Sequence, residues 1–596
     1  MRALFVALML AVSSGRLLAD ASAVGLPPLA AAARDRGVKA ADAGHWDDAV
    51  AAFREAQDRV YCSPDPMFNL ALALDKQGSS TSAALWYRTY LTAKPNAAQA
   101  STLRQRIEVL RQSAETRVRE LFAEAERTAL TLADTALVTG GRSPRAQSLE
   151  TIAFYAYLAD DFGTGDRVSG LISYRPERLE VLRKQQGLWG WSFPLRVAEA
   201  TVRFQRAPSS ERLTLLKLMV EMHSRRLDIA AASRLADTLS AQEMRNMSNG
   251  KEFLDDLISH GAYAAVARLL RDIFSTAGAW DPVAFGSAAR LAFQLTLSGD
   301  VDGARDVAQR AIAHIEAFNP SYYERFVKGD YGGGGEAIGW LTRHMLLKII
   351  ATRANAAGVD RVLHETSGAH FVSETREFGR DVLILVAVLS GASEARNAVN
   401  KISAFSAEAY GSAGTNAVYQ RDIVVPAILA VAENDLTAAR AAFAKYREYA
   451  VKDDSYGTPY HYLGFGQDRE FYDTSSWLLL NLATRMGHWG LALDFARTLP
   501  NSRVALRDLE RFAGNRPDGR AVIDLFRREV CGGSVPLDLA KLTWQVKQAQ
   551  DALLENFAVP EAKWRKLAAG QPDQLPSDIG LYAAGLLATS RGIAAE

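Results

Sequence analysis

The chain has 596 residues, of which 48% are hydrophobic and 23% charged, and its 69 basic side chains nearly balance 68 acidic ones. This composition is typical of a soluble globular protein with room for roughly three or four domain-sized units. The net charge of +1 provides no long-range attraction for nucleic acid or an anionic membrane, so nucleic acid is not expected as a partner.

The N-terminal residues have the layout of a secretory signal peptide. Arg2 is followed by an apolar run over residues 3–12, and Ala21-Ser22-Ala23 offers a small-residue cleavage site. A run of about ten apolar residues is too short to span a bilayer. We therefore expect residues 1–23 to be removed after Ala23, leaving a periplasmic or secreted chain with no integral membrane span. The alternative is an uncleaved first helix of a cytoplasmic adaptor.

Residues 43–56, AGHWDDAVAAFREA, begin a pattern that returns 34 residues later. The matched pairs are Gly37 and Ala71, Gly44 and Gly78, Ala49 and Ala83, Phe53 and Tyr87, and Ala56 and Tyr90. Small residues allow two helices to approach closely, and large residues fill the space between them. Each segment is therefore predicted to form two amphipathic helices joined by a glycine-containing turn.

This pattern resembles the tetratricopeptide repeat over residues 30–96, where the period agrees with the small, large and proline positions together. Weaker echoes follow at residues 224–239, 258–273, 291–312, 427–446 and 479–500. Gly299 and Gly487 stand in two of their turns, and Asn434 replaces the glycine in a third, because Asn also tolerates a left-handed backbone. The resemblance implies an all-α fold, a right-handed superhelical array of antiparallel helix pairs.

Strand patterns are nearly absent, and the apolar segment 381–391 is predicted to be a buried helix. Turn-rich stretches divide the mature chain into four predicted segments. These are 24–140, with the repeats and a long helix over 104–134; 141–317, with degenerate helical repeats; 318–500, with degenerate repeats and aromatic loop insertions; and 501–596, a C-terminal helical region. A continuous solenoid without true boundaries is the alternative.

The sequence contains two cysteines, Cys62 and Cys531. An oxidising compartment permits a disulfide. A stacked array, however, is expected to keep its two ends apart, so the prediction is two unpaired thiols. Two cysteines alone cannot form a structural zinc site.

Recognised catalytic and metal-binding spacings are missing. The glycine run 332–335 is followed by Glu336 instead of the Lys and Ser/Thr of a phosphate-binding loop. His364 and His370 are six residues apart, so they would not share a helix face as the zinc-binding pair of a metalloprotease does. The prediction is a non-enzymatic protein without cofactor or metal.

The loop 453–473 is dense in acidic and aromatic residues. Its candidate contact residues are Tyr456, Tyr460, His461, Asp468 and Glu470. Carboxylates beside aromatic rings can hold and hydrolyse sugars, whereas the same residues also suit a structural loop that packs its rings on the solenoid. An envelope glycan-binding or hydrolytic protein that uses this loop is the alternative function.

The resemblance also implies a binding groove, lined by the first helix of each repeat. The residues placed there are Arg34, Phe68, Asn69, Leu72 and Asp75. This mixed set suits an amphipathic or extended segment, although Phe68 and Leu72 can equally be assigned to the core. The family's clamp for a C-terminal carboxylate is only partly matched, because Val38 and Leu103 stand where Asn and Arg are needed.

The main hypothesis is a non-enzymatic, secreted or periplasmic scaffold that mediates protein–protein interactions in a bacterial cell-envelope assembly. Its partner would be a protein of the envelope or of the secretion or motility machinery.

Overall fold

The computed structural model covers most of the chain, and every regular element in the part described is an α-helix, which confirms the all-α prediction. The described residues are 26–134, 143–159, 161–172, 229–245, 250–259, 261–275, 282–318, 335–352, 354–365, 375–410, 425–442, 474–513, 516–554 and 574–594, with single residues or short runs between 176 and 223, at 444, and between 561 and 565.

The chain divides into two compact units. Unit 1 consists of residues 1–222 and 528–596, and unit 2 consists of residues 223–527. Unit 1 is therefore built from both ends of the sequence. A division by compactness does not test the segment boundaries predicted near residues 140, 317 and 500, which stay predictions.

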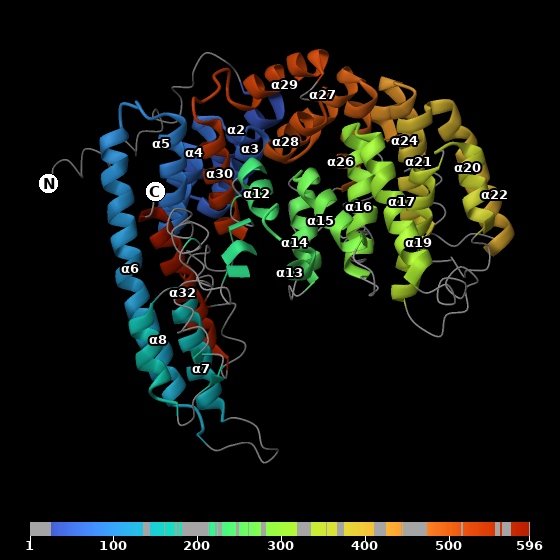
Figure 1. Ribbon diagram of the computed structural model, residues 1–596. Helices are drawn as coiled ribbons and strands as arrows, with labels where there is room; N and C mark the ends of the chain where they lie inside the picture. The colour runs from blue at the N-terminus through green and yellow to red at the C-terminus, as the bar shows by residue number, and fades with distance from the viewer. Residues whose placement is uncertain are drawn as a thin grey trace. The chain divides into compact units, whose positions relative to one another are not determined.

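Unit 1 begins with two stacked helix pairs and a long helix (Figure 1). Its helices are α2 (Pro28–Asp42), α3 (Trp46–Arg59), α4 (Pro64–Gln77), α5 (Ser80–Ala93), α6 (Ala100–Leu130), α7 (Pro144–Leu158), α8 (Phe162–Ser169), α30 (Leu539–Leu554) and α32 (Leu575–Ala594). Helix α2 pairs with α3 and α4 with α5, while α3 packs on α4 and α5 on α6. The 31 residues of α6 confirm the predicted long helix.

The contacts inside these pairs follow the 34-residue offset. Phe53 and Tyr87 are both buried, at 1% and 3% exposure, and the matched Ala49 and Ala83 are fully buried. A Cβ atom at Gly37 would lie 2.6 Å from the Phe53 ring, a separation that real Cβ atoms do not adopt. The large residue of one helix thus fills the space that glycine leaves on the other.

Six turns that follow helices share one hydrogen-bond pattern. Gly78 has a φ of +89°, its N–H donates to the Asp75 carbonyl at 3.2 Å, and the next N–H donates to the Leu74 carbonyl at 2.9 Å. This is the Schellman motif, in which a left-handed residue satisfies the last carbonyls of a helix. The same pattern recurs at Gly44, Gly261, Gly299, Asn434 and Gly487. Asn434, with a φ of +58°, confirms the predicted replacement of glycine.

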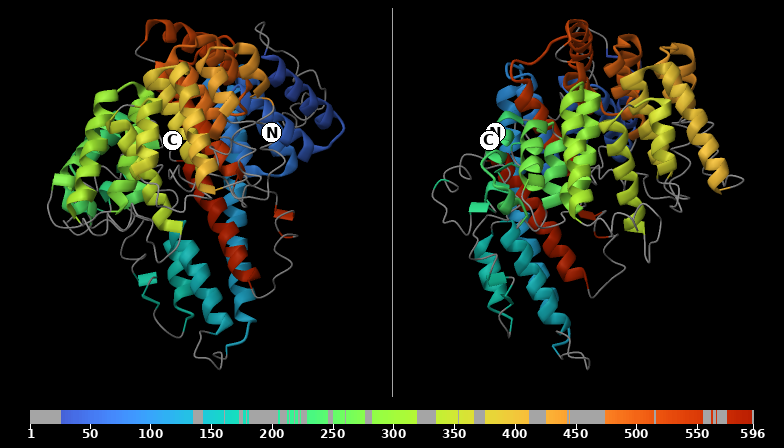
Figure 2. Two further views of the ribbon diagram at one scale, coloured as in Figure 1. Left: turned by 90° about the vertical axis from the view of Figure 1, so that its right-hand side faces the viewer. Right: turned by 45° about the vertical axis from the view of Figure 1, so that its right-hand side comes forward.

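The C-terminal helices of the chain complete unit 1. Helix α32 runs beside α6, as Figures 1 and 2 show, and also packs on α7. The buried cluster between them includes Phe122 of α6, Ile152 of α7 and Tyr582 of α32. Helix α30 packs on α5. Elements that are far apart in sequence therefore share one core.

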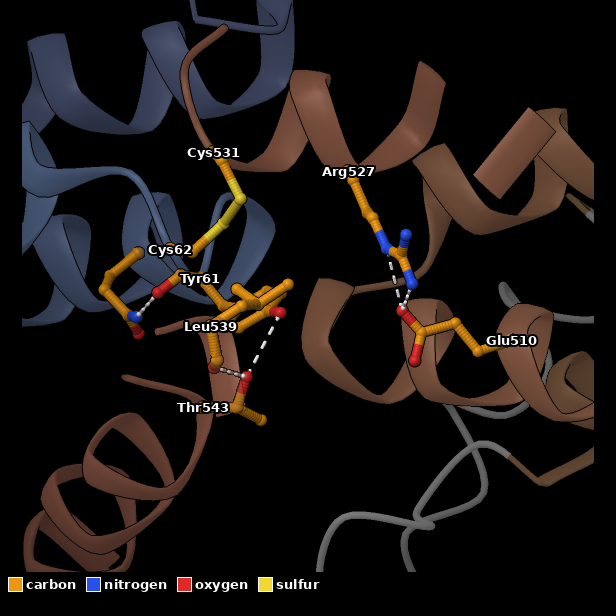
Figure 3. Close-up of a disulfide and its surroundings, with 8 residues drawn as sticks. Tyr61, Cys62, Glu510, Arg527, Cys531, Leu539 and Thr543 are labelled. Atoms are coloured by element: carbon orange, nitrogen blue, oxygen red, sulfur yellow. Dashed lines mark hydrogen bonds and ion pairs between the residues drawn. A yellow bond between two sulfur atoms is a disulfide. The ribbon is translucent and has the colours of Figure 1, made fainter. Parts of the chain in front are cut away.

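The same return of the chain brings Cys531 to Cys62, and the two form a disulfide with Cα atoms 4.6 Å apart (Figure 3). The prediction of two unpaired thiols is therefore wrong. It treated the chain as a stack whose ends stay apart, but residues after 527 fold back into the unit that contains Cys62.

Unit 2 is also built from helix pairs, arranged around α16. Its helices are α12 (Ile229–Ala236), α13 (Ala241–Arg245), α14 (Gly250–Ser259), α15 (Tyr263–Ser275), α16 (Pro282–Ser298), α17 (Val301–Phe318), α19 (Gly335–Ala351), α20 (Ala356–Glu365), α21 (Thr375–Ser390), α22 (Ala392–Tyr410), α24 (Val425–Ala432), α26 (Thr474–Met486), α27 (Trp489–Thr498), α28 (Ser502–Ala513) and α29 (Pro517–Val530), which crosses the boundary of the unit. Residues 382–387 of α21 are buried, which confirms the predicted buried helix.

The core of unit 2 contains polar side chains that the spacing of apolar residues in the sequence does not predict. Arg290 of α16 is 1% exposed, and its Nη1 lies 3.3 Å from Asp255 Oδ1 of α14. The Ser287 hydroxyl donates to the same carboxylate at 3.3 Å. His344 of α19 is fully buried, with its ring centroid 6.4 Å from that of Phe285. Burial lowers the pKa of His344 to about 3.

Two turns of unit 2 are covered by arginine side chains. Arg511 donates from Nη2 to the Ile258 carbonyl at 2.6 Å, and its guanidinium lies 4.5 Å from the ring centroid of Tyr263. Arg516 donates to the Arg485 carbonyl at 3.0 Å and stacks at 5.0 Å over Trp489. A cation at the C-terminal end of a helix is favourable because the exposed carbonyls carry partial negative charge.

Among the residues that the structure describes, no helix combines the length and the apolar character needed to cross a membrane.

Candidate functional site

The residues of the predicted groove lie on α2 and α4, the first helices of the two repeats. We define the groove face by Arg34 of α2, Asp65, Phe68 and Leu72 of α4, and Arg106 of α6. Phe68 and Leu72 are both half-buried. The Phe68 ring centroid lies 5.2 Å from that of Tyr90 on α5. Phe68 therefore supports the repeat with one side of its ring and keeps part of its apolar surface exposed.

Asn69 takes a different position from its neighbour. It is only 4% exposed, so its side chain is turned into the repeat and is not presented to a partner. The reason is helical geometry, because the next residue along a helix points about 100° away. Asn69 stands at the position where the family has a groove residue. The orientation of α4, however, turns Asn69 inward and leaves Phe68 and Leu72 closer to the surface.

Asp75 is held by an ion pair across two helices. Arg106 of α6 donates from Nε to Asp75 Oδ2 at 2.9 Å and from Nη2 to Oδ1 at 2.5 Å. The Tyr87 hydroxyl donates to the same carboxylate at 3.3 Å, and burial, together with the Asp75 charge, raises the pKa of Tyr87. Such a two-point pair fixes α6 against α4. Asp75 therefore shapes one end of the groove face.

The other end of the groove face contains Asp65, which the sequence analysis missed. Burial raises the pKa of Asp65, while the positive charges of Lys94 and Arg34 act to lower it. Arg34 is 26% exposed along its side chain and pairs with the exposed Asp35 at 2.7 Å. The spacing of Asp65 three residues before Phe68 could have revealed it, because residues i and i+3 share a helix face.

Comparison with known proteins bears on this part of the chain. Residues 34–98 match the family model of the tetratricopeptide repeat. These residues form tetratricopeptide repeats. No curated protein matches the chain. The family supports a general role as a scaffold for protein–protein contacts.

The tetratricopeptide repeats offer an apolar centre between two charged ends. Asp65 and Asp75 are ten residues apart on α4, which corresponds to about 15 Å along the helix. Phe68 and Leu72 lie between them. A face of this kind can hold a short peptide segment, with apolar side chains supplying affinity and charged groups fixing its direction.

The second predicted site cannot be placed. Tyr456, Tyr460, His461, Asp468 and Glu470 lie outside the described residues, as does His370. Within the described ranges, no three His, Cys, Asp or Glu side chains are grouped so that they could hold a metal ion.

Proposed function

We propose that the chain is a non-enzymatic scaffold of the periplasm or of the secreted fraction, and that its tetratricopeptide repeats bind a segment of a protein partner in a cell-envelope assembly. The observation that carries the proposal is the groove face, where the half-buried Phe68 and Leu72 lie between charged positions. A solvent-facing apolar pair of this kind gains free energy when a partner covers it.

The charges suggest the chemistry of the segment. Arg34 and Lys94 bring two positive charges to the end of the groove face that contains Asp65, and Arg34 also pairs with the exposed Asp35. An acidic group on the partner would replace Asp35 as the group that pairs with Arg34. At about 3.4 Å per residue, an extended segment of about four or five residues would span the 15 Å between Asp65 and Asp75. The proposed ligand is thus a short segment with an apolar centre and an acidic group at one end.

The proposed location rests on chemistry as well as on the signal-like N-terminus. Disulfides persist in oxidising compartments and are rare in the cytosol, and the fold contains a buried one between Cys62 and Cys531. We expect intact mass spectrometry of the protein from its native host to show removal of residues 1–23. Thiol titration after denaturation should find no free cysteine. An unprocessed chain with two titratable thiols would contradict the location.

The groove face can be tested by partner capture with two matched variants. Arg34→Glu reverses a charge on the groove face, whereas Arg36→Glu makes the same change on α2 at a side chain that is 57% exposed and bonded to Glu55 of α3. Tagged full-length proteins would be crosslinked in the native host, and the captured proteins compared by quantitative mass spectrometry. We expect Arg34→Glu to lower the yield of the main partner about tenfold, as the loss of one charge-assisted contact predicts.

The control variant decides how this experiment is interpreted. Exposed ion pairs contribute little to stability, so Arg36→Glu should retain both the fold and the partner. If both variants lose the partner equally, or if neither variant loses it, the groove face does not bind the partner.

A further inference from the structure

The C-terminal return, which we define as residues 528–554, is attached to the first repeat by three buried links. One is the disulfide between Cys62 and Cys531, whose residues are 0% and 1% exposed. The second joins the hydroxyls of Tyr61 and Thr543 at 3.3 Å (Figure 3). Because the Thr543 hydroxyl donates to the Leu539 carbonyl at 2.7 Å, Tyr61 is the donor in this pair.

The third link is an amide contact between α30 and the end of α3. Gln550 donates from Nε2 to Gln57 Oε1 at 3.1 Å and also to Asp58. Gln57 is fully buried, and its own Nε2 donates to the Tyr61 carbonyl at 3.0 Å. Both polar ends of this buried amide are therefore satisfied, as a stable core requires. All of these contacts fall on residues 57–62, which are the last residues of α3 and the start of its connection to α4.

That connection leads directly into the groove face. Cys62 is followed by Ser63, which is 2% exposed, and α4 begins at Pro64. The C-terminal return packs closely against Ser63, because a Cβ atom at Gly532 would lie 3.1 Å from Ser63 Oγ. Asp65, Phe68 and Leu72 occupy the next turns of α4. The disulfide therefore fixes the start of the helix that contributes most of the groove face.

We propose that the Cys62–Cys531 disulfide is a redox-sensitive bond that sets the position of α4 and therefore the competence of the groove face. A dithiol reductant would open it by attack of one thiolate on a sulfur, giving a mixed disulfide that the second thiol resolves. The protein then carries two thiols and the reductant becomes a disulfide. Because Cys62 and Cys531 are 0% and 1% exposed, this attack requires local opening of the C-terminal return, which contains the exposed Val535 and Leu537.

Opening this bond has local consequences because the remaining links are few. Without the covalent bond, the C-terminal return is held to the connection by the Tyr61–Thr543 and Gln550 hydrogen bonds and by apolar packing. Each such hydrogen bond contributes little net stability, because in the open state the same groups bond to water. The return then opens more often, and the first turns of α4 lose the neighbours that bury Cys62 and Ser63. The effect on partner binding rests on the proposed function, but the effect on α4 can be measured without any partner.

Amide hydrogen exchange of the full-length protein tests the proposal. The samples are the oxidised protein, the same folded protein treated with dithiothreitol, and the double variant Cys62→Ser/Cys531→Ser. We expect amides of residues 60–70 and 539–554 to exchange at least about tenfold faster in the reduced protein, whereas α16 of unit 2 keeps its rate, because local opening affects one cooperative segment at a time. Dithiothreitol should have no further effect on the double variant.

Three results of the exchange experiment would overturn the proposal. The first is a disulfide that dithiothreitol fails to reduce in native buffer. The second is acceleration confined to residues 528–554, with residues 60–70 unchanged, which would separate the disulfide from the groove face. The third is equal acceleration in α16, which would show that the bond holds the entire fold. If α4 loosens but partner capture is unchanged on reduction, the scaffold function stands and control of the groove face by the disulfide is refuted.

Discussion

Replacing Arg290 by methionine is expected to lower the free energy of unfolding of unit 2 by about 3–5 kcal/mol. Arg290 and Asp255 form an ion pair inside the core, with side chains 1% and 11% exposed. Removing the cation leaves the carboxylate buried without its opposite charge, which costs more than the pair contributes when intact. The change in the free energy of unfolding can be measured by urea denaturation monitored through the hydrogen exchange of amides in α14 and α16.

Two further variants make this expectation specific. Replacing both partners, with Asp255→Leu and Arg290→Met, should recover much of the loss, because no buried charge is then left alone. Arg310→Met breaks an exposed pair with Asp306 on α17, with side chains 43% and 41% exposed, and should cost at most about 0.5 kcal/mol. Additive losses in the double variant would mean that the two side chains do not act as a pair.

Acidification is expected to destabilise unit 2 through His344. Burial, helped by the positive charge of Lys348, lowers the pKa of His344 from 6.5 to about 3. Between these values the unfolded chain binds a proton that the folded chain does not. The free energy of unfolding should therefore fall by up to about 1.4 kcal/mol for each pH unit between 6.5 and about 3. Above pH 6.5 His344 is neutral in both the folded and the unfolded chain, so it does not lower the stability there.

The contribution of His344 can be separated by comparing variants. His344→Leu has no group to titrate, so the stability of this variant should depend less on pH between 6.5 and 4.5 than that of the unmodified protein. Leu347→Met serves as the control, because Leu347 is a fully buried residue of the same helix and carries no titratable group, so this variant should keep the pH dependence of the unmodified protein. Urea unfolding at several pH values gives the comparison. Parallel profiles for His344→Leu and the unmodified protein would contradict the assignment.

The local structure of the repeats could be predicted because short-range rules determine it. The 34-residue offset placed the buried Phe53 and Tyr87, and turn chemistry placed Gly78 and Asn434 in left-handed conformations. These features depend on neighbouring residues along one or two helices. The prediction of Asp75 at the groove was incomplete, because its ion pair depends on Arg106 from a third helix.

The contacts made by the C-terminal return and by α32 could not be predicted, because no periodicity connects Cys62 with Cys531 or α6 with α32. Such pairings depend on where the chain goes after several hundred residues. Helix α32 is apolar and rich in small residues, which predicts burial but not a partner. The sequence also did not determine which face of α4 is exposed, since rotating the helix by one residue exchanges Asn69 with Phe68 at the surface.

The discontinuity of unit 1 imposes a waiting time during protein synthesis. The repeats end near residue 98, whereas the segment that completes their unit begins at residue 528. At about 5–20 residues per second, the ribosome takes about 20–90 s to translate the intervening stretch. Throughout that interval Leu121 and Phe122 of α6 lack the helix that buries them. A chain that folds during translation therefore exposes this apolar surface to aggregation until α32 has been made.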